Sequence, residues 1–144
     1  MKSEKKAFVF DLDGTLFETS ARVLGSNSSP SFIEFADSTK LLTESTPLPL
    51  LYLAQEVCAE GHQVYILTAR KSIIARAIKE LLLSYNVHAT YVYCVGDRGL
   101  DIPAYKAEIL GALNGLNLDA VYYFDDETPN LIMAEKTGVY VRRA

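Results

Sequence analysis

Short apolar runs alternate along this chain with segments whose apolar residues recur every three to four positions. Runs of the first kind are typical of buried strands, and the spaced pattern indicates amphipathic helices. Strands are expected at Ala7–Phe10, Val64–Leu67, Thr90–Val95, Ala120–Phe124 and Val139–Arg142. Helices are expected at Pro47–Glu60, Lys71–Tyr85, Ile102–Leu113 and Thr128–Lys136. The alternation predicts βαβ units, and therefore an α/β protein: a three-layer α/β/α sandwich around a five-stranded, mainly parallel sheet.

Two segments refine this picture. The Lys71–Tyr85 helix is expected to bury one face, whose members are Ile73, Ile74, Ala77, Ile78, Leu81, Leu82 and Tyr85. The polar stretch of about 19–46 breaks the alternation, and within it Ser31–Leu42 is a candidate short helix with Ser31 as its N-cap. We therefore expect one domain, 1–144, with a small insertion at about 19–46.

Composition limits the classes of function. A chain of 144 residues that is 49% apolar can build one core of its own. Its net charge of −4 disfavours broad contact with the nucleic-acid backbone, so nucleic acid is expected only as a substrate. The charged N-terminus leads directly into a short strand, and no apolar run reaches transmembrane length. These features predict a cytoplasmic protein without membrane contact.

The cysteines and histidines do not suggest a site. Cys58 lies in a helical pattern and Cys94 in a strand pattern, which favours two buried free thiols in a reducing compartment. His62 and His88 have no second histidine or cysteine at ligand spacing, and both are interpreted as structural or surface residues.

Two carboxylates end the first apolar run. Asp11 and Asp13 are spaced i, i+2, so in an extended chain they leave on the same side. Carboxylates this close repel each other unless a proton or a cation lies between them, and a hard divalent ion suits oxygen ligands. The plainer alternative is an Asx-rich turn in which Gly14 supplies a positive φ.

The string Asp11-x-Asp13-Gly14-Thr15-Leu16, directly behind Phe-Val-Phe, resembles the first motif of the haloacid dehalogenase (HAD) superfamily of phosphohydrolases. The resemblance implies a Rossmann-like sheet and a Mg²⁺ ion. It also implies that Asp11 attacks phosphorus and that Asp13 acts as general acid and base. Backbone amides around Gly14 would then contact the phosphate.

Further motifs follow in the order that this family has them. The strand that ends in Thr68 resembles the second motif, which implies that the Thr68 hydroxyl and the neighbouring Ala69 backbone bind a phosphoryl oxygen. Arg70 is either a bidentate phosphate contact or a cap on the sheet edge. Lys106 stands where the family has its phosphate-binding lysine.

The last motif is the acidic pair Asp125-Asp126 after an apolar strand, which resembles the family's metal-binding motif. The resemblance implies that Asp125 binds Mg²⁺ together with Asp11 and the backbone carbonyl of Asp13, and that Asp126 is a direct or indirect ligand. Asn130 is a candidate brace of this loop or a substrate contact. An acidic turn that caps the next helix is the alternative.

A second acidic string, Gly96–Asp101, looks like another form of that metal motif, but it precedes Lys106 and follows the strand expected at the sheet edge. We interpret it as a loop at the rim of the pocket. Asp97 within it is also a formal acceptor if the chain is a response-regulator receiver, although the Asp11-x-Asp13 spacing does not match the adjacent acidic pair of receivers.

The resulting hypothesis is a Mg²⁺-dependent phosphomonoester hydrolase that forms an aspartyl-phosphate on Asp11. The chain has room for no full cap domain, which favours a small phosphorylated substrate or an exposed phosphoester on a larger molecule. A nucleotide and a nucleic-acid end phosphate are the candidates. The competing hypothesis is a non-catalytic, phospho-ligand-binding or regulatory member of the same fold.

Overall fold

The computed structural model describes residues 5–19 and 45–144, and its centre is a five-stranded sheet in the order β5-β4-β1-β6-β7. Every neighbouring pair of strands is parallel. The strands are β1 (Lys6–Phe10), β4 (Gln63–Thr68), β5 (Tyr91–Cys94), β6 (Ala120–Asp125) and β7 (Tyr140–Arg143). The prediction of an α/β fold with a parallel, Rossmann-like sheet is confirmed.

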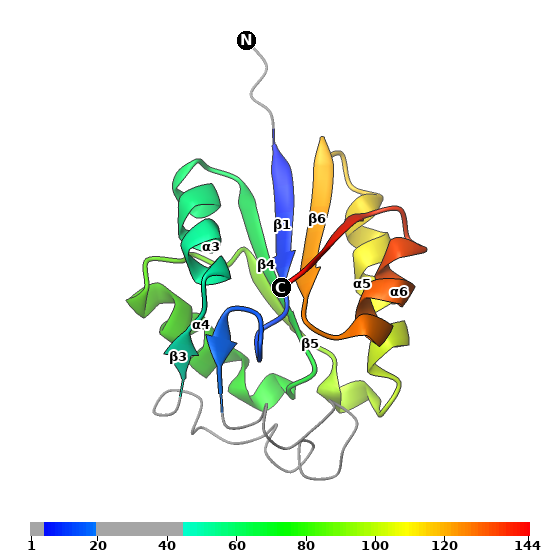
Figure 1. Ribbon diagram of the computed structural model, residues 1–144, viewed down its shortest axis with the longest axis horizontal. Helices are drawn as coiled ribbons and strands as arrows, with labels where there is room; N and C mark the ends of the chain where they lie inside the picture. The colour runs from blue at the N-terminus through cyan, green and yellow to red at the C-terminus, as the bar shows by residue number, and fades with distance from the viewer. Residues whose placement is uncertain (1–4, 20–44) are drawn as a thin grey trace.

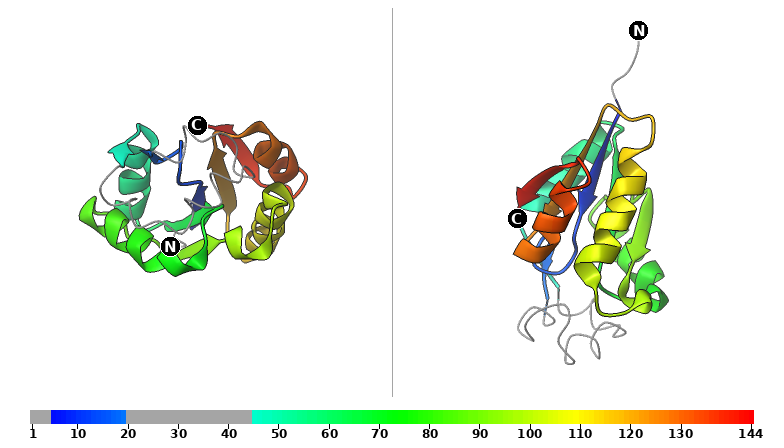
Figure 2. Two further views of the ribbon diagram at one scale, coloured as in Figure 1. Left: turned by 90° about the horizontal axis from the view of Figure 1, so that it is seen from below. Right: turned by 90° about the vertical axis from the view of Figure 1, so that its right-hand side faces the viewer.

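Four helices cover the two faces of the sheet. Figure 1 shows α3 and α4 on one face, and α5 and α6 on the other; the left picture of Figure 2 shows the same three layers from below. The helices are α3 (Leu50–Ala59), α4 (Ala75–Ser84), α5 (Ile102–Asn114) and α6 (Thr128–Glu135). Alternate residues of β1 enter different cores, because Phe10 packs with the α3 and α4 side chains while Val9 packs with those of α5 and α6.

The register of the central strands determines where polar side chains can meet. Phe10, the last residue of β1, lies opposite Ile66 of β4 and Phe124 of β6, so β6 ends one residue and β4 two residues beyond this row. The amide of Asp11 continues the ladder by donating to the Phe124 carbonyl oxygen over 2.9 Å. Asp11, Thr68 and Asp125 therefore emerge at one edge, where ligands bind in open parallel sheets.

The helix expected from Pro47 is shorter than predicted. Pro47 belongs instead to β3 (Thr46–Pro47), which pairs antiparallel with β2 (Phe17–Glu18). The helix α3 begins at Leu50, directly after Pro49, which has helical φ and ψ values. The expected Ser31–Leu42 helix and most of the 19–46 insertion lie outside the described residues.

The helix expected from Lys71 also begins later, because the 3₁₀ turn η2 (Ser72–Ile74) precedes α4. A 3₁₀ turn has three residues per turn, so the side-chain directions of an α-helix do not extend through it. Ile74 is buried, but Ile73 is 77% exposed, and its assignment to the buried face was wrong.

The isolated cysteines and histidines have no part in a site. Cys58 and Cys94 are free thiols and half-buried, and burial raises the pKa of Cys94 to about 12. His62 accepts a hydrogen bond at Nδ1 from the Lys6 amide over 3.3 Å, and His88 is exposed. Across 5–19 and 45–144, no helix is long and apolar enough to cross a membrane.

Candidate active site

Three carboxylates meet at the carboxyl edge of the sheet. Oxygen atoms of Asp11, Asp125 and Asp126 all lie within 4.8 Å of one another, and we call these residues the acidic cluster. Asp11 follows β1, Asp125 ends β6, and Asp126 is the next residue. Asp11 and Asp125 are buried, whereas Asp126 is half-buried. The alignment of β1 with β6 thus brings together residues that are more than a hundred positions apart in the sequence.

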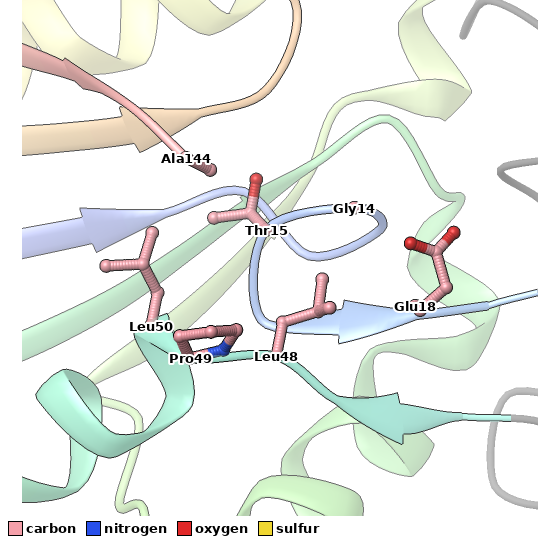
Figure 3. Close-up of a pocket in the computed structure, with 7 residues that line it drawn as sticks. All are labelled: Gly14, Thr15, Glu18, Leu48, Pro49, Leu50 and Ala144. Atoms are coloured by element: carbon pink, nitrogen blue, oxygen red, sulfur yellow. The ribbon is translucent and has the colours of Figure 1, made fainter.

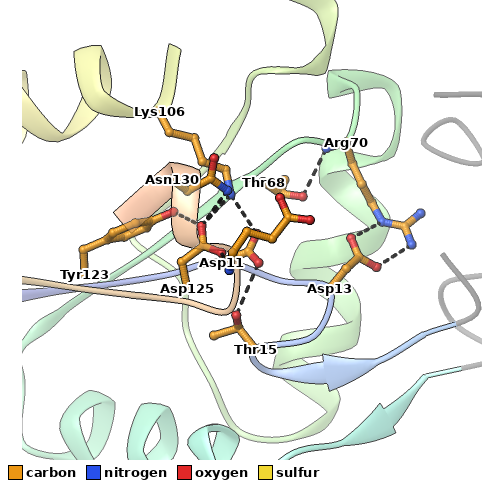
Figure 4. A network of polar contacts seen from close by, with 10 residues as sticks. Asp11, Asp13, Thr15, Thr68, Arg70, Lys106, Tyr123, Asp125 and Asn130 are labelled. Atoms are coloured by element: carbon orange, nitrogen blue, oxygen red, sulfur yellow. Dashed lines mark hydrogen bonds and ion pairs between the residues drawn. The ribbon is translucent and has the colours of Figure 1, made fainter. Parts of the chain in front are cut away.

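Lys106 reaches this cluster from α5. Its Nζ donates to Asp11 Oδ1 over 2.9 Å and to Asp125 Oδ2 over 3.1 Å, and its side chain is fully buried (Figure 4). Burial alone would lower the pKa of Lys106, but the carboxylates of Asp11 and Asp125 outweigh it and raise that pKa. The ammonium therefore stays charged at neutral pH.

The charges of this site do not cancel. The acidic cluster and Lys106 together carry two formal negative charges in excess when all four are ionised. Burial, and then the charge of Asp125, raise the pKa of Asp11 well above its usual range. Burial also acts to raise the pKa of Asp125, but Lys106 and the Tyr123 hydroxyl outweigh it and lower that pKa. Clustered oxygen donors with excess negative charge fit a hard divalent cation such as Mg²⁺.

Besides Lys106, three further hydrogen-bond donors hold Asp125 in place. Asn130 Nδ2 and the Tyr123 hydroxyl both donate to Oδ2, the former over 2.9 Å, and the Glu127 amide donates to Oδ1 over 2.9 Å. The structure therefore places Asn130 on Asp125. Tyr123 was not predicted from the sequence, because its position in an apolar strand is that of a core residue.

The predicted phosphate contacts lie on the neighbouring segments. Thr68 is fully buried at the end of β4, and its Oγ1 accepts a hydrogen bond from the Arg70 amide over 3.1 Å. Ala69, the next residue, is also buried. Gly14 has φ of 81°, and its amide donates to the Phe17 carbonyl oxygen over 2.8 Å, so this amide already serves the turn. Their contacts with phosphate stay predictions.

Thr15 and Asp13 lie on either side of Gly14. The Thr15 hydroxyl donates to Asp11 Oδ2 over 3.3 Å, so both oxygens of Asp11 have a donor. The Asp13 carboxylate instead faces Arg70, whose Nε and Nη2 donate to it over 2.9 and 2.7 Å (Figure 4). The structure thus brings together Asp11, Asp125, Asp126 and Lys106, while the Asp13 side chain lies beside them in a pair of its own.

The architecture is shared with known structures. No family model and no curated protein matches the sequence. A chain of a Pnkp1/Rnl/Hen1 complex is 18% identical with a TM-score of 0.68; the match covers all of this chain and 47% of that one, so this protein spans about half its length. A dehalogenase is 16% identical with a TM-score of 0.68, over 99% of this chain and 86% of that one.

A third structure is a HAD-family enzyme from Bacteroides thetaiotaomicron in complex with magnesium and inorganic phosphate. It is 14% identical with a TM-score of 0.59, over 96% of this chain and 93% of that one. This protein has the HAD-like fold. At these identities the likeness establishes the architecture, and the reaction must be argued from the side chains.

In this HAD-like fold, a pocket lies on the other side of the Asp11–Thr15 loop. It has a cavity volume of about 270 Å³ and is lined by Gly14, Thr15, Glu18, Leu48, Pro49, Leu50 and Ala144 (Figure 3). The carboxylate of Glu18 would repel a phosphate group, and much of the remaining lining is apolar. The buried cation Lys106 lies beside Asp11 and is not among these lining residues.

The second acidic string takes no part in the cluster of this HAD-like fold. Residues Gly96–Arg98 form a 3₁₀ turn, η3, after the edge strand β5. Asp97 is exposed, and its Oδ2 accepts a hydrogen bond from the Ser72 amide over 2.9 Å. The clustered carboxylates come from β1 and β6, which favours Asp11 over Asp97 as a reacting group.

Proposed function

We propose that this protein is a Mg²⁺-dependent phosphomonoester hydrolase that works through an aspartyl-phosphate on Asp11. The observation that supports it most is the acidic cluster: three carboxylates with Lys106 as a buried cation against two of them. Burying charges is costly unless they are compensated, so an arrangement with excess negative charge suits a site that takes a divalent cation.

Asp11, Asp125 and Asp126 would hold the Mg²⁺ ion, joined by the backbone carbonyl of Asp13 as the family resemblance implies. When bound, the ion supplies a Lewis acid for a phosphoryl oxygen and screens the attacking carboxylate. Tyr123 and Asn130 keep Asp125 in one orientation, so the ligand does not have to be ordered when the metal binds.

Asp11 is the nucleophile of the proposed reaction, and neighbouring side chains orient it and stabilise the phosphoryl oxygens. Asp11 is fixed by Lys106 at one oxygen and by Thr15 at the other, so the nucleophile is oriented before the substrate arrives. An Asp11 oxygen forms the bond to phosphorus while the bond to the leaving oxygen breaks. Lys106 and the Thr68 hydroxyl stabilise charge on the phosphoryl oxygens.

In this proposal Asp13 is the general acid of the first step and the general base of the second. In the first step the protonated form of Asp13 donates its proton to the leaving oxygen, which releases the alcohol and leaves Asp13 as the carboxylate. In the second step it takes a proton from the water that attacks the aspartyl-phosphate, and this releases inorganic phosphate and restores Asp11. The balance is one ester and one water converted into one alcohol and one phosphate.

A dehalogenase is the second candidate, because three of the similar structures are described as dehalogenases. In that reaction Asp11 would attack carbon and displace a halide. The acidic cluster argues against it, since a halo acid brings another negative charge and no cation to three carboxylates. A panel that measures both phosphate and halide release separates the two candidates.

The substrate class is proposed from the small size of the chain around the site. Only η2, α4, β5 and η3 lie between Thr68 and Lys106, so the described part of the chain has no cap domain in that interval. An exposed phosphoester on a nucleotide or at a nucleic-acid end is the candidate. One similar structure is described as an RNA repair complex, which adds end-phosphorylated oligonucleotides to the panel.

The experiment compares the wild type with Asp11→Asn on nucleotides, sugar phosphates, phosphopeptides, oligonucleotide end phosphates and 2-chloropropionate, with Mg²⁺ or with chelator. We expect phosphate release that needs Mg²⁺ and that falls about 10³-fold or more in the variant, while its unfolding midpoint stays near that of the wild type. Asp101→Asn is the matched control, because Asp101 is an exposed aspartate outside the acidic cluster, and it should retain activity. Full activity in Asp11→Asn would refute the proposal. Phosphate binding without turnover would favour the non-catalytic alternative.

A further inference from the structure

The guanidinium group of Arg70 contacts the carboxylate of Asp13 and not the proposed phosphate site. We propose that Arg70 is a positioning residue that aims the Asp13 carboxylate at the leaving oxygen, and that the segment 95–97, directly after the edge strand β5, sets the position of Arg70. This inference rests on the proposed function and goes beyond it, because it assigns Arg70 a partner and assigns the second acidic string a purpose.

Arg70 and Asp13 form a bidentate ion pair. Two guanidinium nitrogens meet two carboxylate oxygens, Nε with Oδ2 at 2.9 Å and Nη2 with Oδ1 at 2.7 Å. A fork of this kind fixes the plane of a carboxylate as well as its distance, which a lysine cannot do. The Thr19 hydroxyl donates to Asp13 Oδ1 as well, so three donors hold this carboxylate.

Burial makes the pair difficult to exchange for a phosphate contact. Arg70 is 0% exposed and Asp13 is 8% exposed. If Arg70 turned to a phosphate, it would leave a buried carboxylate without its main partner, which is strongly destabilising. Lys106 already supplies a cation beside Asp11. The geometry therefore favours Arg70 acting through Asp13.

The backbone of Arg70 is held by the neighbouring strand end. The Val95 amide donates to the Thr68 carbonyl oxygen over 2.9 Å, and the Gly96 amide donates to the Arg70 carbonyl oxygen over 3.2 Å. One residue further, Asp97 Oδ2 accepts from the Ser72 amide over 2.9 Å. Three successive residues thus brace the segment that carries both Thr68 and Arg70.

Gly96 is the point in this brace that tolerates no side chain. A Cβ atom there would lie 2.3 Å from the Ala69 carbonyl oxygen and 3.0 Å from the Arg70 carbonyl oxygen. Both neighbours are backbone atoms, so the strand ends would have to separate. A substitution at Gly96 therefore moves Arg70 without touching the acidic cluster.

The experiment uses two esters that differ in how much they need a proton. An alkyl phosphate such as glycerol 2-phosphate has a poor leaving group that needs general acid, whereas the leaving group of p-nitrophenyl phosphate departs with little help. For Arg70→Gln we expect kcat on the alkyl ester to fall about 10²-fold and kcat on the nitrophenyl ester to fall less than about fivefold. Arg70→Lys should fall between wild type and Arg70→Gln on the alkyl ester, and inhibition by inorganic phosphate should change less than about twofold.

Each other outcome overturns the assignment in a recognisable way. Equal losses on both esters together with weaker inhibition by phosphate would make Arg70 a phosphate ligand. Unchanged kinetics with a lower unfolding midpoint would make the pair a structural one. An inactive wild type would refute the proposed function itself, and this inference with it, whereas an active wild type confines any failure to the role of Arg70.

Gly96→Ala provides a test that leaves both partners of the ion pair in place. We expect the same selective loss on the alkyl ester, about tenfold, because the fork is displaced rather than removed. Gly111→Ala is the matched control, since a Cβ atom at that position in α5 meets nothing within 4 Å. It should have wild-type kinetics on both esters. If Gly96→Ala folds and also has wild-type kinetics, the segment 95–97 does not position Arg70.

Discussion

Two groups of buried charges lie next to each other at the edge of this sheet, and they differ in their balance. The Asp13–Arg70 pair is neutral as a unit, and each formal charge has its partner in the protein. The acidic cluster with Lys106 has two negative charges in excess. The neutral Asp13–Arg70 pair is suited to hold a side chain in position. The acidic cluster with Lys106 is suited to bind a cation and to react.

The largest effect is expected where the charged group loses its own cation. In Lys106→Met the Asp11 and Asp125 carboxylates face each other in a buried site, so we expect a loss of about 3–5 kcal/mol in the free energy of unfolding. We also expect no measurable turnover. Urea unfolding with chelator and with Mg²⁺ measures the effect, and Mg²⁺ should restore more stability in the variant than it adds to the wild type. Equal responses to Mg²⁺ would argue against a metal in this cluster.

The neutral pair should respond to substitution as a unit. We expect Arg70→Met alone to lower the free energy of unfolding by about 3 kcal/mol, because it leaves the Asp13 carboxylate buried without its fork. The double variant Arg70→Met/Asp13→Leu should recover most of this loss, with a coupling energy of about 2 kcal/mol. A double-mutant cycle by denaturant unfolding measures it. Additive losses would show that the two side chains do not stabilise each other.

A smaller effect is expected at Tyr123, whose hydroxyl donates to Asp125. Tyr123→Phe should lower the affinity for Mg²⁺ about tenfold, because the ligand loses one of the donors that orient it. The free energy of unfolding should fall by about 1–2 kcal/mol. Tyr65→Phe is the control, since the Tyr65 hydroxyl donates to Gln63 over 2.7 Å. Calorimetric titration with Mg²⁺ compares the two, and equal affinities would remove Tyr123 from the site.

The smallest effect concerns the brace at the edge strand. Hydrogen bonds from the Ser72 side chain and amide lower the pKa of Asp97 from its usual value of 3.8. A carboxyl whose pKa is lower in the folded state stabilises it above the unfolded pKa, and the contribution disappears as pH falls through the folded pKa. Asp97→Asn should therefore cost up to about 1 kcal/mol at pH 6, and this cost should shrink steadily as the pH falls below 3.8. A difference that does not depend on pH would show that the charge of Asp97 is not involved.

The elements were predictable where local pattern and tertiary structure agree. The strand β1, for example, was expected at Ala7–Phe10 and runs from Lys6 to Phe10. The pattern failed where the backbone changes its geometry within an apolar stretch. Pro47 pairs in β3 instead of starting a helix, and Ile73 faces outward because the first turn is a 3₁₀ turn.

The site was predictable in its residues and less so in their contacts. The motifs pointed to Asp11, Lys106 and Asp125, and the register of parallel strands brings these three together. The partner of Arg70 was not predictable, because phosphate and Asp13 offer an arginine the same pair of oxygens. Only the fold shows which of them lies within reach.

The ladder between β2 and β3 has a consequence for the interval that separates them. Phe17 lies opposite Pro47 and Glu18 opposite Thr46, so the described residues on either side of this interval are neighbours in space. Closing a loop across a fixed gap costs an entropy that grows with the logarithm of its length, about 0.6 kcal/mol for each doubling. Evolution or an engineer can therefore lengthen, shorten or exchange this interval at small thermodynamic cost, next to the loop that carries Asp13.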